Sequence, residues 1–271
     1  MAGVSSLSLA TAREQLEPRL AGASLALARD LFGVLEILDS NAGLRRALTD
    51  PSRTGKDKAV LVDQLISGRV STEALGVVRD LASGRWASPR DIGDALETLA
   101  ATVVIAVAEQ GGAGAEGLER LEDQLHAFIT TVASDHGLQR ALSEAQASPE
   151  SRVALALKLV PGAGDAAQLL ITQAVASPRG LKPAALVGSF LELVAARQQR
   201  WIAEVSVSRP LTQVQHDKLV SGLNSMYGRD LKVNVSIDPS LVGGVRVSIG
   251  DEVVDSTVAT RLSELRRKLA G

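Results

Sequence analysis

The feature that most constrains the fold of this chain is an internal repeat. When the sequence is compared with itself at an offset of 94 residues, identical residues coincide at helix-like intervals over a long stretch. The clearest pairs are Leu27/Leu121, Leu31/Leu125, Gly43/Gly137, Leu44/Leu138, Arg46/Arg140, Leu48/Leu142, Leu61/Leu155 and Leu75/Leu169. Further on, the register slips by one residue, to Leu96/Leu191 and Glu97/Glu192, as a loop insertion would produce. A repeat of this kind marks a duplicated folding unit, so it sets the architecture before any single motif does.

Each copy is predicted to hold several short helices followed by a long one. In the first copy, Ser88 and Pro89 suit an N-cap and a first helical position, and one apolar stripe follows: Ile92, Leu96, Leu99, Val103 and Val107. The second copy repeats this stripe at Val187, Leu191, Val194 and Ile202, with Pro183 near its start. Hydrophobic residues make up 45% of the chain and aromatic residues only 2%, so Ala, Leu and Val must fill closely packed helical cores.

From Ala203 onward the apolar period changes from helical to alternating, which is typical of half-buried strands. Three strands are predicted around Val205–Val207, Val233–Ile237 and Val245–Ile249. Between the first two, Thr212 and Gln215 form a capping box for a crossover helix with an apolar stripe, which ends at Gly228; the stripe is Leu219, Leu223 and Met226. Gly250 and Asp251 suit a hairpin to Val253, and a final helix is expected to start near Asp255.

The predicted fold class is therefore mainly α with a smaller α/β C-terminal domain. The expected order is a first helical bundle (1–110), a Gly-rich linker (111–117), a second bundle that repeats the first (115–202) and a C-terminal domain of β-α-β-β-α order (203–271). A chain of 271 residues is long enough for two or three such domains.

Composition excludes several classes of function. The formal net charge of −2 gives no bulk attraction for nucleic acid or anionic lipid, so no nucleic-acid partner is expected. The chain has no cysteine, which excludes disulfides, a thiol nucleophile and thiolate zinc sites. The longest apolar run, from Leu99 to Ala108, is half the length of a membrane span, and the N-terminal segment lacks the pattern of a signal peptide. Any membrane association is thus expected to be indirect, through a partner.

At the C-terminal end, a long pattern resembles a known family. The stretches AEVSVSRPLTQVQ (203–215) and DPSLVGGVRVSIGDEVVDSTVATRLSEL (238–265) are similar to the C-terminal signature of the ATP synthase delta subunit, which is related to the mitochondrial oligomycin-sensitivity-conferring subunit. The matching positions are Pro210, Leu211, Asp238, Pro239, Gly243, Gly244, Gly250, Asp251, Asp255, Arg261 and Leu262. Upstream, GLRRALTDPS (43–52) resembles the helical domain of the same family. Two departures stand out: Ser256 and Thr257 follow Asp255 where the family usually has Gly and Ser, and the helical bundle is duplicated, as in extended delta subunits of actinobacteria.

The resemblance implies a non-catalytic stator subunit of the F-type ATP synthase, without a cofactor. Its helical part would bind N-terminal segments of the alpha subunits, and its C-terminal part would bind the end of the b subunit of the peripheral stalk. The joint would resist rotor torque at the cytoplasmic face of the bacterial plasma membrane. The second copy is expected to keep the contact with alpha, because it leads directly into the C-terminal domain. The alternative is a helical scaffold or adaptor that is unrelated to ATP synthase and binds partner helices.

Other patterns compete with this interpretation. Gly112, Gly114 and Gly117 match the dinucleotide fingerprint G-x-G-x-x-G behind a strand-like run, but the repeat predicts that this run continues a long helix and that the glycines form a linker. Gly243-Gly244 could cradle a phosphate, yet the doublet lies between two strands, which favours a turn or bulge.

Catalytic and metal-binding groups are not evident in the sequence. The three histidines, His126, His136 and His216, lack the spacing of metal ligands, so no metal and no catalytic residue is assigned. Candidate partner-binding residues are Trp86, Trp201 and Phe190, because aromatic residues are enriched at interface hot spots; either Trp could equally fill a core.

Overall fold

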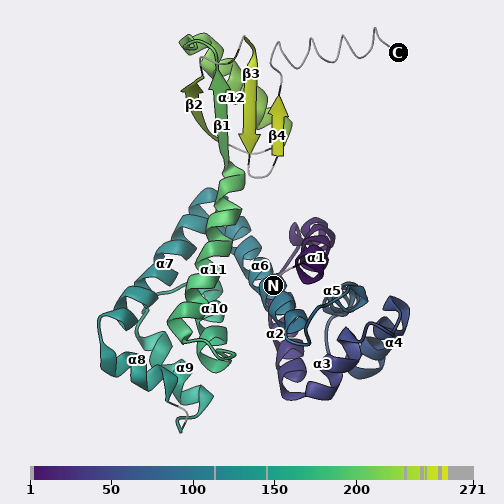
Figure 1. Cartoon of the computed structure of the whole chain (residues 1–271). Helices are drawn as coiled ribbons and strands as arrows, with labels where there is room; N and C mark the ends of the chain where they lie inside the picture. The colour runs from purple at the N-terminus through teal and green to yellow at the C-terminus, as the bar shows by residue number, and fades with distance from the viewer. Residues whose placement is uncertain are drawn as a thin grey trace. The chain divides into compact units, whose positions relative to one another are not determined.

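The chain divides into two compact units, Met1–Val194 and Ala195–Gly271 (Figure 1). The computed structural model describes residues 3–112, 114–144, 146–228, 231–238, 241, 243–249 and 252–255. The first unit is helical, and the second contains a small sheet with a helix, which confirms the predicted fold class. The expected final helix after Asp255 lies outside the described residues.

The first unit is built from helices joined by short loops. They are α1 (Val4–Leu20), α2 (Leu25–Ser40), α3 (Ala42–Thr49), α4 (Gly55–Ile66), α5 (Thr72–Ser83), α6 (Asp91–Gly111), α7 (Ala115–Ala133), α8 (His136–Ser143), α9 (Pro149–Lys158), α10 (Asp165–Ala176) and α11 (Pro183–Gln198), the last of which continues into the second unit.

The sequence repeat is visible in the helix boundaries. Helices α3 and α8 begin and end 94 residues apart, and so do their N-caps, Asn41 and Asp135, whose side chains accept backbone N–H groups of the first turn. Helices α4 and α9 also begin 94 residues apart, and so do their N-caps, Thr54 and Ser148. These side chains satisfy N–H groups that a helix start leaves unpaired, so both copies use the same local chemistry to begin equivalent helices.

Helix α6 belongs to both copies. A shift of α1 by 94 residues covers 98–114, which overlaps the C-terminal half of α6. Helix α6 packs against α1 and α2 of the first copy and against α7 and α10 of the second (Figure 1). Its apolar residues are therefore buried nearly all round rather than along one stripe, from Ile92 through Leu99 and Val103 to Ala106.

The start of α6 differs from the prediction. The helix begins at Asp91, and its N-cap is Arg90 rather than Ser88, so Pro89 lies in the preceding turn. In that turn the Ser88 carbonyl oxygen accepts the Asp91 N–H at 3.1 Å, and the Ser88 hydroxyl accepts the Arg90 N–H at 3.3 Å. The buried hydroxyl of Ser5 donates to the Asp91 carboxylate at 2.6 Å, which fixes the helix start against α1.

The prediction for the end of the second copy was wrong in one respect. Helix α11 ends at Gln198, a 3-10 turn follows at Gln199–Trp201, and Ile202 opens the first strand instead of continuing the apolar helical stripe. The secondary structure of Ile202 therefore follows the alternating pattern of the strand that it begins, and not the helical pattern that the repeat predicts.

The corner between α6 and α7 depends on glycine. A Cβ on Gly117 would clash with the carbonyl oxygen of Ala108, and a Cβ on Gly112 would clash with the backbone of Gly117. Gly114, with φ of 77°, adopts the left-handed region that other residues avoid. The two backbones thus approach closely here. The domain boundaries at 110–117 and 202/203 stay a prediction.

In the second unit, a four-stranded sheet has the order β2-β1-β3-β4. Its elements are β1 (Ile202–Val207), α12 (Gln213–Tyr227), β2 (Lys232–Ile237), β3 (Val245–Ile249) and β4 (Glu252–Asp255). Strands β1 and β2 are parallel, as the crossover helix requires, and the other pairs are antiparallel. The predicted strands and the crossover helix are confirmed.

Local sequence explains α12 well. Thr212 and Gln215 form the predicted capping box in both directions, and Gly228 ends the helix with φ of 65°. Leu223 contributes to a core with Leu231, which directly precedes β2, and with the inward side chains of the sheet, which are Ala203, Val205, Val207, Val247 and Ile249. Met226, expected on the same stripe, is instead exposed, and Tyr227 packs against this core in its place.

Candidate interaction surfaces

The histidine and acidic side chains of the described residues do not assemble into a metal site. In that part of the chain, no group of three or more His, Asp or Glu side chains could hold a metal ion. His126 lies on α7, 4.0 Å from Glu122, and His216 lies on α12, 3.6 Å from Asp217. His136 is the first residue of α8. The three histidines are therefore on three separate helices.

The dinucleotide fingerprint has no nucleotide-binding geometry. The run before the glycines is the C-terminal half of α6, as the repeat predicts, and not a strand. A Rossmann fingerprint requires a strand, a tight turn and a helix N-terminus around the pyrophosphate. Gly112 and Gly117 instead contact each other, so no space for a phosphate remains between them.

The most buried charge cluster centres on Arg179, in the loop between α10 and α11. Its Nε donates to Asp39 Oδ2 on α2 at 2.7 Å, and its Nη1 donates to Glu97 Oε2 on α6 at 3.2 Å. The same Nη1 forms an ion pair with Asp94 Oδ1 on α6 at 2.8 Å. Only 9% of the Arg179 side chain is exposed. We call Arg179, Asp39, Asp94 and Glu97 the Arg179 cluster. It connects the second copy to two helices of the first.

Burial and charge pairing have opposite effects on the pKa values of Glu97 and Arg179 in this cluster. Burial raises the pKa of Glu97, although the charge and hydrogen bond of Arg179 lower it in part. Burial also works against the charge of Arg179, but the Glu97, Asp39 and Asp94 carboxylates outweigh it and raise the pKa of the guanidinium. Glu97 Oε1 is buried without a hydrogen-bond partner. Desolvation of this kind is tolerable only while opposite charges stay paired, so each partner depends on the others.

Two features of the sequence make room for the Arg179 cluster. Gly93 on α6 lies under the guanidinium, because a Cβ at this position would be 2.5 Å from Arg179 Nη2. Arg90 donates to the Arg179 carbonyl oxygen at 2.9 Å and stabilises a backbone that has φ of 51°. Sequence analysis did not find this site. A usable signal was the tetrapeptide ASPR, which occurs before α6 (87–90) and again before α11 (176–179).

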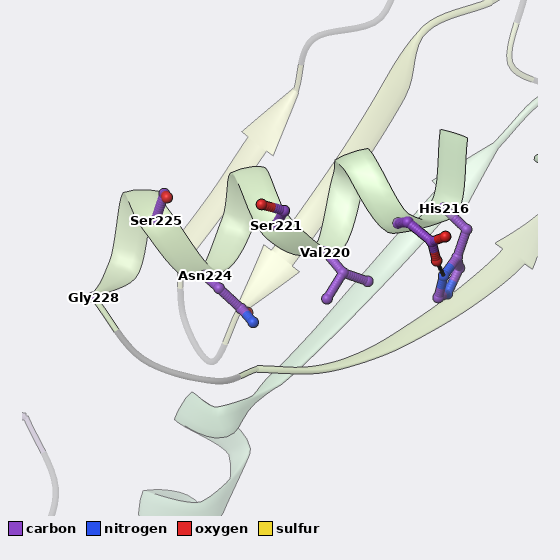
Figure 2. Close-up of a pocket in the computed structure, with 7 residues that line it drawn as sticks. His216, Val220, Ser221, Asn224, Ser225 and Gly228 are labelled. Atoms are coloured by element: carbon purple, nitrogen blue, oxygen red, sulfur yellow. Dashed lines mark ion pairs between the residues drawn. The ribbon is translucent and has the colours of Figure 1, made fainter. Parts of the chain in front are cut away.

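A second candidate surface lies on the C-terminal unit. A hollow of about 700 Å³ is lined by one side of α12, with Val220 and Asn224 at its centre and His216 at one end (Figure 2). Val220, Asn224 and His216 point to the same side of the helix in Figure 2. On β2, the edge strand, Val235 and Ile237 are exposed although they pair in register with the buried Val205 and Val207 of β1. An apolar edge of this kind is suited to a protein partner.

The predicted aromatic anchors differ in position. Trp86 is buried in the first copy, where its Nε1 donates to the Leu81 carbonyl oxygen at 3.1 Å, and Phe190 is buried on α11. Trp201 is half-buried in the 3-10 turn before β1. The roles of Trp86, Phe190 and Trp201 in partner binding stay a prediction, with Trp86 and Phe190 filling cores in the isolated chain.

The signature positions are mostly structural where the structure describes them. Leu211 packs against the core of the sheet, and the Asp238 N–H donates to the Val207 carbonyl oxygen at 2.9 Å. Gly243 and Gly244 have φ of 156° and 89° in a bend directly before β3, which confirms the predicted turn. Pro210 is exposed in the loop before α12, and the backbone of Asp255 ends β4. Pro239, Gly250, Asp251, Arg261 and Leu262 lie outside the described residues.

Comparisons with known proteins agree with the sequence signature. The family described as ATP synthase delta (OSCP) subunit matches residues 101–269. Two relatives called ATP synthase subunit delta, from Pseudarthrobacter chlorophenolicus and Renibacterium salmoninarum, are each 61% identical to this chain over 100% of both sequences. A third, from Thermobifida fusca, is 40% identical over 100% of both.

The similarity to solved structures is weaker. One chain of a structure titled as the cryo-EM structure of the Toxoplasma gondii mitochondrial ATP synthase hexamer shares 15% identity. The match covers 63% of this chain and 97% of that one, and its TM-score of 0.35 is too low to support an argument. The family match and the full-length relatives are sufficient by themselves. The chain belongs to the family of ATP synthase delta (OSCP) subunits, which are structural and not catalytic parts of that enzyme complex.

Proposed function

We propose that this chain connects the catalytic head of the ATP synthase to its peripheral stalk and resists rotor torque. The observation that carries the proposal is the family match over residues 101–269, together with relatives that align over their full length. A joint of this kind needs well-packed interfaces rather than a reactive group. The absence of a metal cluster from the described residues is compatible with such a role.

The second copy and the C-terminal unit are proposed to carry the family's partner contacts. The family match begins at residue 101, within α6, and so includes the helices of the second copy and the sheet. We assign the N-terminal segments of the alpha subunits to the second copy. The end of the b subunit is assigned to the C-terminal unit, where the α12 hollow and the exposed apolar side chains of β2 support it.

The mechanical part of the proposal is supported by the Arg179 cluster. Three carboxylates on two helices of the first copy hold one guanidinium of the second copy within 3.2 Å or less. A bond network with little solvent access restrains relative motion of the helices more than exposed ion pairs do. Stiffness between the copies is what a torque-bearing joint requires.

The proposed location is the cytoplasmic face of the bacterial plasma membrane, through the complex. Among the described residues, every helix is too short or too polar to cross a lipid bilayer. Membrane association would therefore depend on the other subunits of the synthase.

The test is co-purification with matched surface variants. Tagged full-length protein is incubated with membranes stripped of their own delta subunit, and recovered alpha and b subunits are quantified. Ile237 on β2 and Val60 on α4 are exposed to nearly the same extent, 55% and 54%. Ile237→Glu should reduce recovery of b, because a buried unpaired carboxylate is costly, whereas Val60→Glu should leave it unchanged.

Two results would contradict the proposal. If wild-type protein recovers neither alpha nor b, the stator role is wrong. If wild-type protein recovers both but Ile237→Glu recovers b as well as wild type does, the β2 edge is not the contact for b, while the stator role stands.

A further inference from the structure

The turn between α10 and α11 contains a strained residue. Arg179 and Gly180 follow each other with φ of 51° and 85°, and the Leu181 N–H donates to the Pro178 carbonyl oxygen at 2.9 Å. Two successive residues with positive φ inside such a bond are typical of a type I′ turn, which favours Gly, Asn or Asp at these positions. Among the described residues, Arg179 is the only non-glycine residue with a positive φ. We call residues 178–181 the α10–α11 turn.

Tertiary contacts hold Arg179 in this conformation. A side chain at positive φ is strained, and the strain persists only where the surroundings offset it. Here the guanidinium is bound to carboxylates of α2 and α6, and Arg90 donates to the Arg179 carbonyl oxygen. The strained backbone of the turn and the Arg179 cluster therefore depend on each other.

The first copy shows the same tetrapeptide with a relaxed backbone. ASPR occurs at 87–90 and at 176–179, so Arg90 is the equivalent of Arg179. Arg90 has φ of −78° and ψ of −36°, which lie in the ordinary right-handed helical region. The tetrapeptide therefore does not itself impose a positive φ. The strain at Arg179 is a consequence of its contacts with the first copy.

Two carboxylates of the Arg179 cluster have a second cation nearby. Asp39 Oδ1 lies 3.9 Å from Arg45 Nη1, and Asp94 Oδ2 lies 3.7 Å from Arg90 Nε. These two carboxylates therefore keep a cation if the α10–α11 turn withdraws its guanidinium. Because a buried charge is costly mainly when it is left without a partner, the second cations reduce the cost of that withdrawal.

Glu97 is the carboxylate that holds the turn closed. Among the described residues, Arg179 is the only cation within 4.0 Å of Glu97, and Glu97 Oε1 is buried without a hydrogen-bond partner. A hollow of about 530 Å³ adjoins the cluster, and Arg179 lines it together with Ser88 and Ser177 of the two tetrapeptides. The guanidinium thus has space outside the cluster, and Glu97 is the partner that it would have to leave.

We propose that the α10–α11 turn is a releasable strap between the two copies. In the closed form, which the structure shows, Arg179 is bound in its cluster and has a positive φ. In the released form, Arg179 withdraws into the hollow, its φ becomes negative as at Arg90, and the hydrogen bond from Leu181 to Pro178 breaks. The start of α11 then separates from α2 and α6 while both helical bundles stay folded. The strap is a property of this chain alone and does not rest on the proposed function.

The test is native-state hydrogen exchange of single backbone amides in the isolated full-length protein. The Leu181 amide reports the closed turn, the Ala163 amide, which donates to the Val160 carbonyl oxygen at 3.1 Å, reports the α9–α10 loop, and the amides of α6 report global unfolding. Glu97→Gln keeps the shape of the side chain but removes its charge. We expect exchange at Leu181 to become about tenfold faster, because the charge-assisted hydrogen bond from Arg179 is weakened. Exchange in α6 should not become faster, since the variant no longer buries a carboxylate.

Two glycines provide a matched pair of variants. Gly180 in the α10–α11 turn and Gly162 in the α9–α10 loop have φ of 85° and 83°, and a Cβ on either would meet no atom within 4 Å. Gly180→Ala adds strain to the closed turn without touching the cluster, so it should also accelerate exchange at Leu181. Gly162→Ala should accelerate exchange at Ala163 and leave Leu181 unchanged.

Three results would overturn the strap. If Leu181 exchanges at the same rate in wild type and in Glu97→Gln, the cluster does not hold the turn. If Glu97→Gln accelerates Leu181 and the amides of α6 by the same factor, Glu97 stabilises the whole bundle and no separate released form exists. If Gly162→Ala accelerates Leu181 as much as Gly180→Ala does, the opening is not local to the turn. The proposed function stands in all three cases.

Discussion

Removal of the guanidinium of Arg179 is the sharpest test of how the two copies are held together. Arg179→Leu would leave Asp39, Asp94 and Glu97 without their shared cation, and Glu97 is only 12% exposed. Breaking a buried ion pair by deletion of one partner typically costs about 3–5 kcal/mol of unfolding free energy. Asp39 and Asp94, at 28% and 33% exposed, can recover some hydration, so we expect the lower half of this range.

The pH dependence follows from Glu97. Burial already raises the pKa of Glu97, and loss of Arg179 would raise it further. The folded variant would then hold a proton that the unfolded chain releases above the ordinary glutamate pKa of about 4.3. Its stability is therefore highest at acidic pH and falls as the pH rises through the raised pKa of Glu97. We expect the deficit relative to wild type to be larger at pH 8 than at pH 5.

The assay is urea unfolding followed by circular dichroism at both pH values, with thermal unfolding as a second measurement. For a unit of this size, about 1 kcal/mol corresponds to roughly 2–4 °C in Tm, so a loss of about 3 kcal/mol should lower Tm by roughly 6–12 °C. Arg69→Leu, an exposed arginine outside the cluster, is the matched control. A loss under about 1 kcal/mol at pH 8, or a loss that is the same at both pH values, would refute the argument.

Three further predictions concern packing. Gly93→Ala should cost about 1–3 kcal/mol, because its Cβ would contact the Arg179 guanidinium, whereas Gly188→Ala, at the equivalent position of the second copy with nothing within 4 Å, should stabilise slightly; chemical denaturation compares the two. Ser5→Ala should cost about 1–3 kcal/mol, because the half-buried carboxylate of Asp91 at the start of α6 loses the donor that Ser5 provides, and Ser5→Thr should recover part of this loss in the same assay. Gly117→Ala should unfold at a clearly lower temperature than wild type, since its Cβ would meet a carbonyl oxygen of α6, and an unchanged melting curve would show that the α6–α7 corner can move apart.

Much of the fold could be predicted from local patterns. Three local signals each determine structure within a few residues, and all three are found as predicted. They are the capping box of Thr212 and Gln215, the alternation of Val205 and Val207 with polar residues, and the glycine at 228. The repeat also predicted the helical run that resembles a dinucleotide motif, because equivalent segments share their secondary structure. These signals are either short-range motifs or patterns repeated in both copies, so a single sequence is enough to detect them.

The errors have a common physical origin in tertiary contacts. Met226 follows the apolar period of α12 but lies beyond the reach of the sheet, so it is exposed. The start of α6 is set by the contact between Ser5 and Asp91, which are 86 residues apart. The Arg179 cluster joins residues up to 140 apart in the sequence, and the repeated tetrapeptide ASPR marks the position of Arg179 but not its carboxylate partners. Of the candidate surfaces, only the signature positions were predictable, since they depend on family resemblance.

The shared position of α6 has a consequence for how duplication changed this subunit. Since one helix completes the first bundle and also begins the second, the two copies are joined along a continuous backbone of hydrogen-bonded turns instead of a tether. A force applied to one copy is transmitted to the other through that rod without a hinge in between. Deletion of either copy would also remove or expose apolar residues of α6 that fill the core of the other copy. Duplication of the helical bundle therefore extended one continuous structure through the shared helix α6, instead of adding a separate domain on a flexible linker.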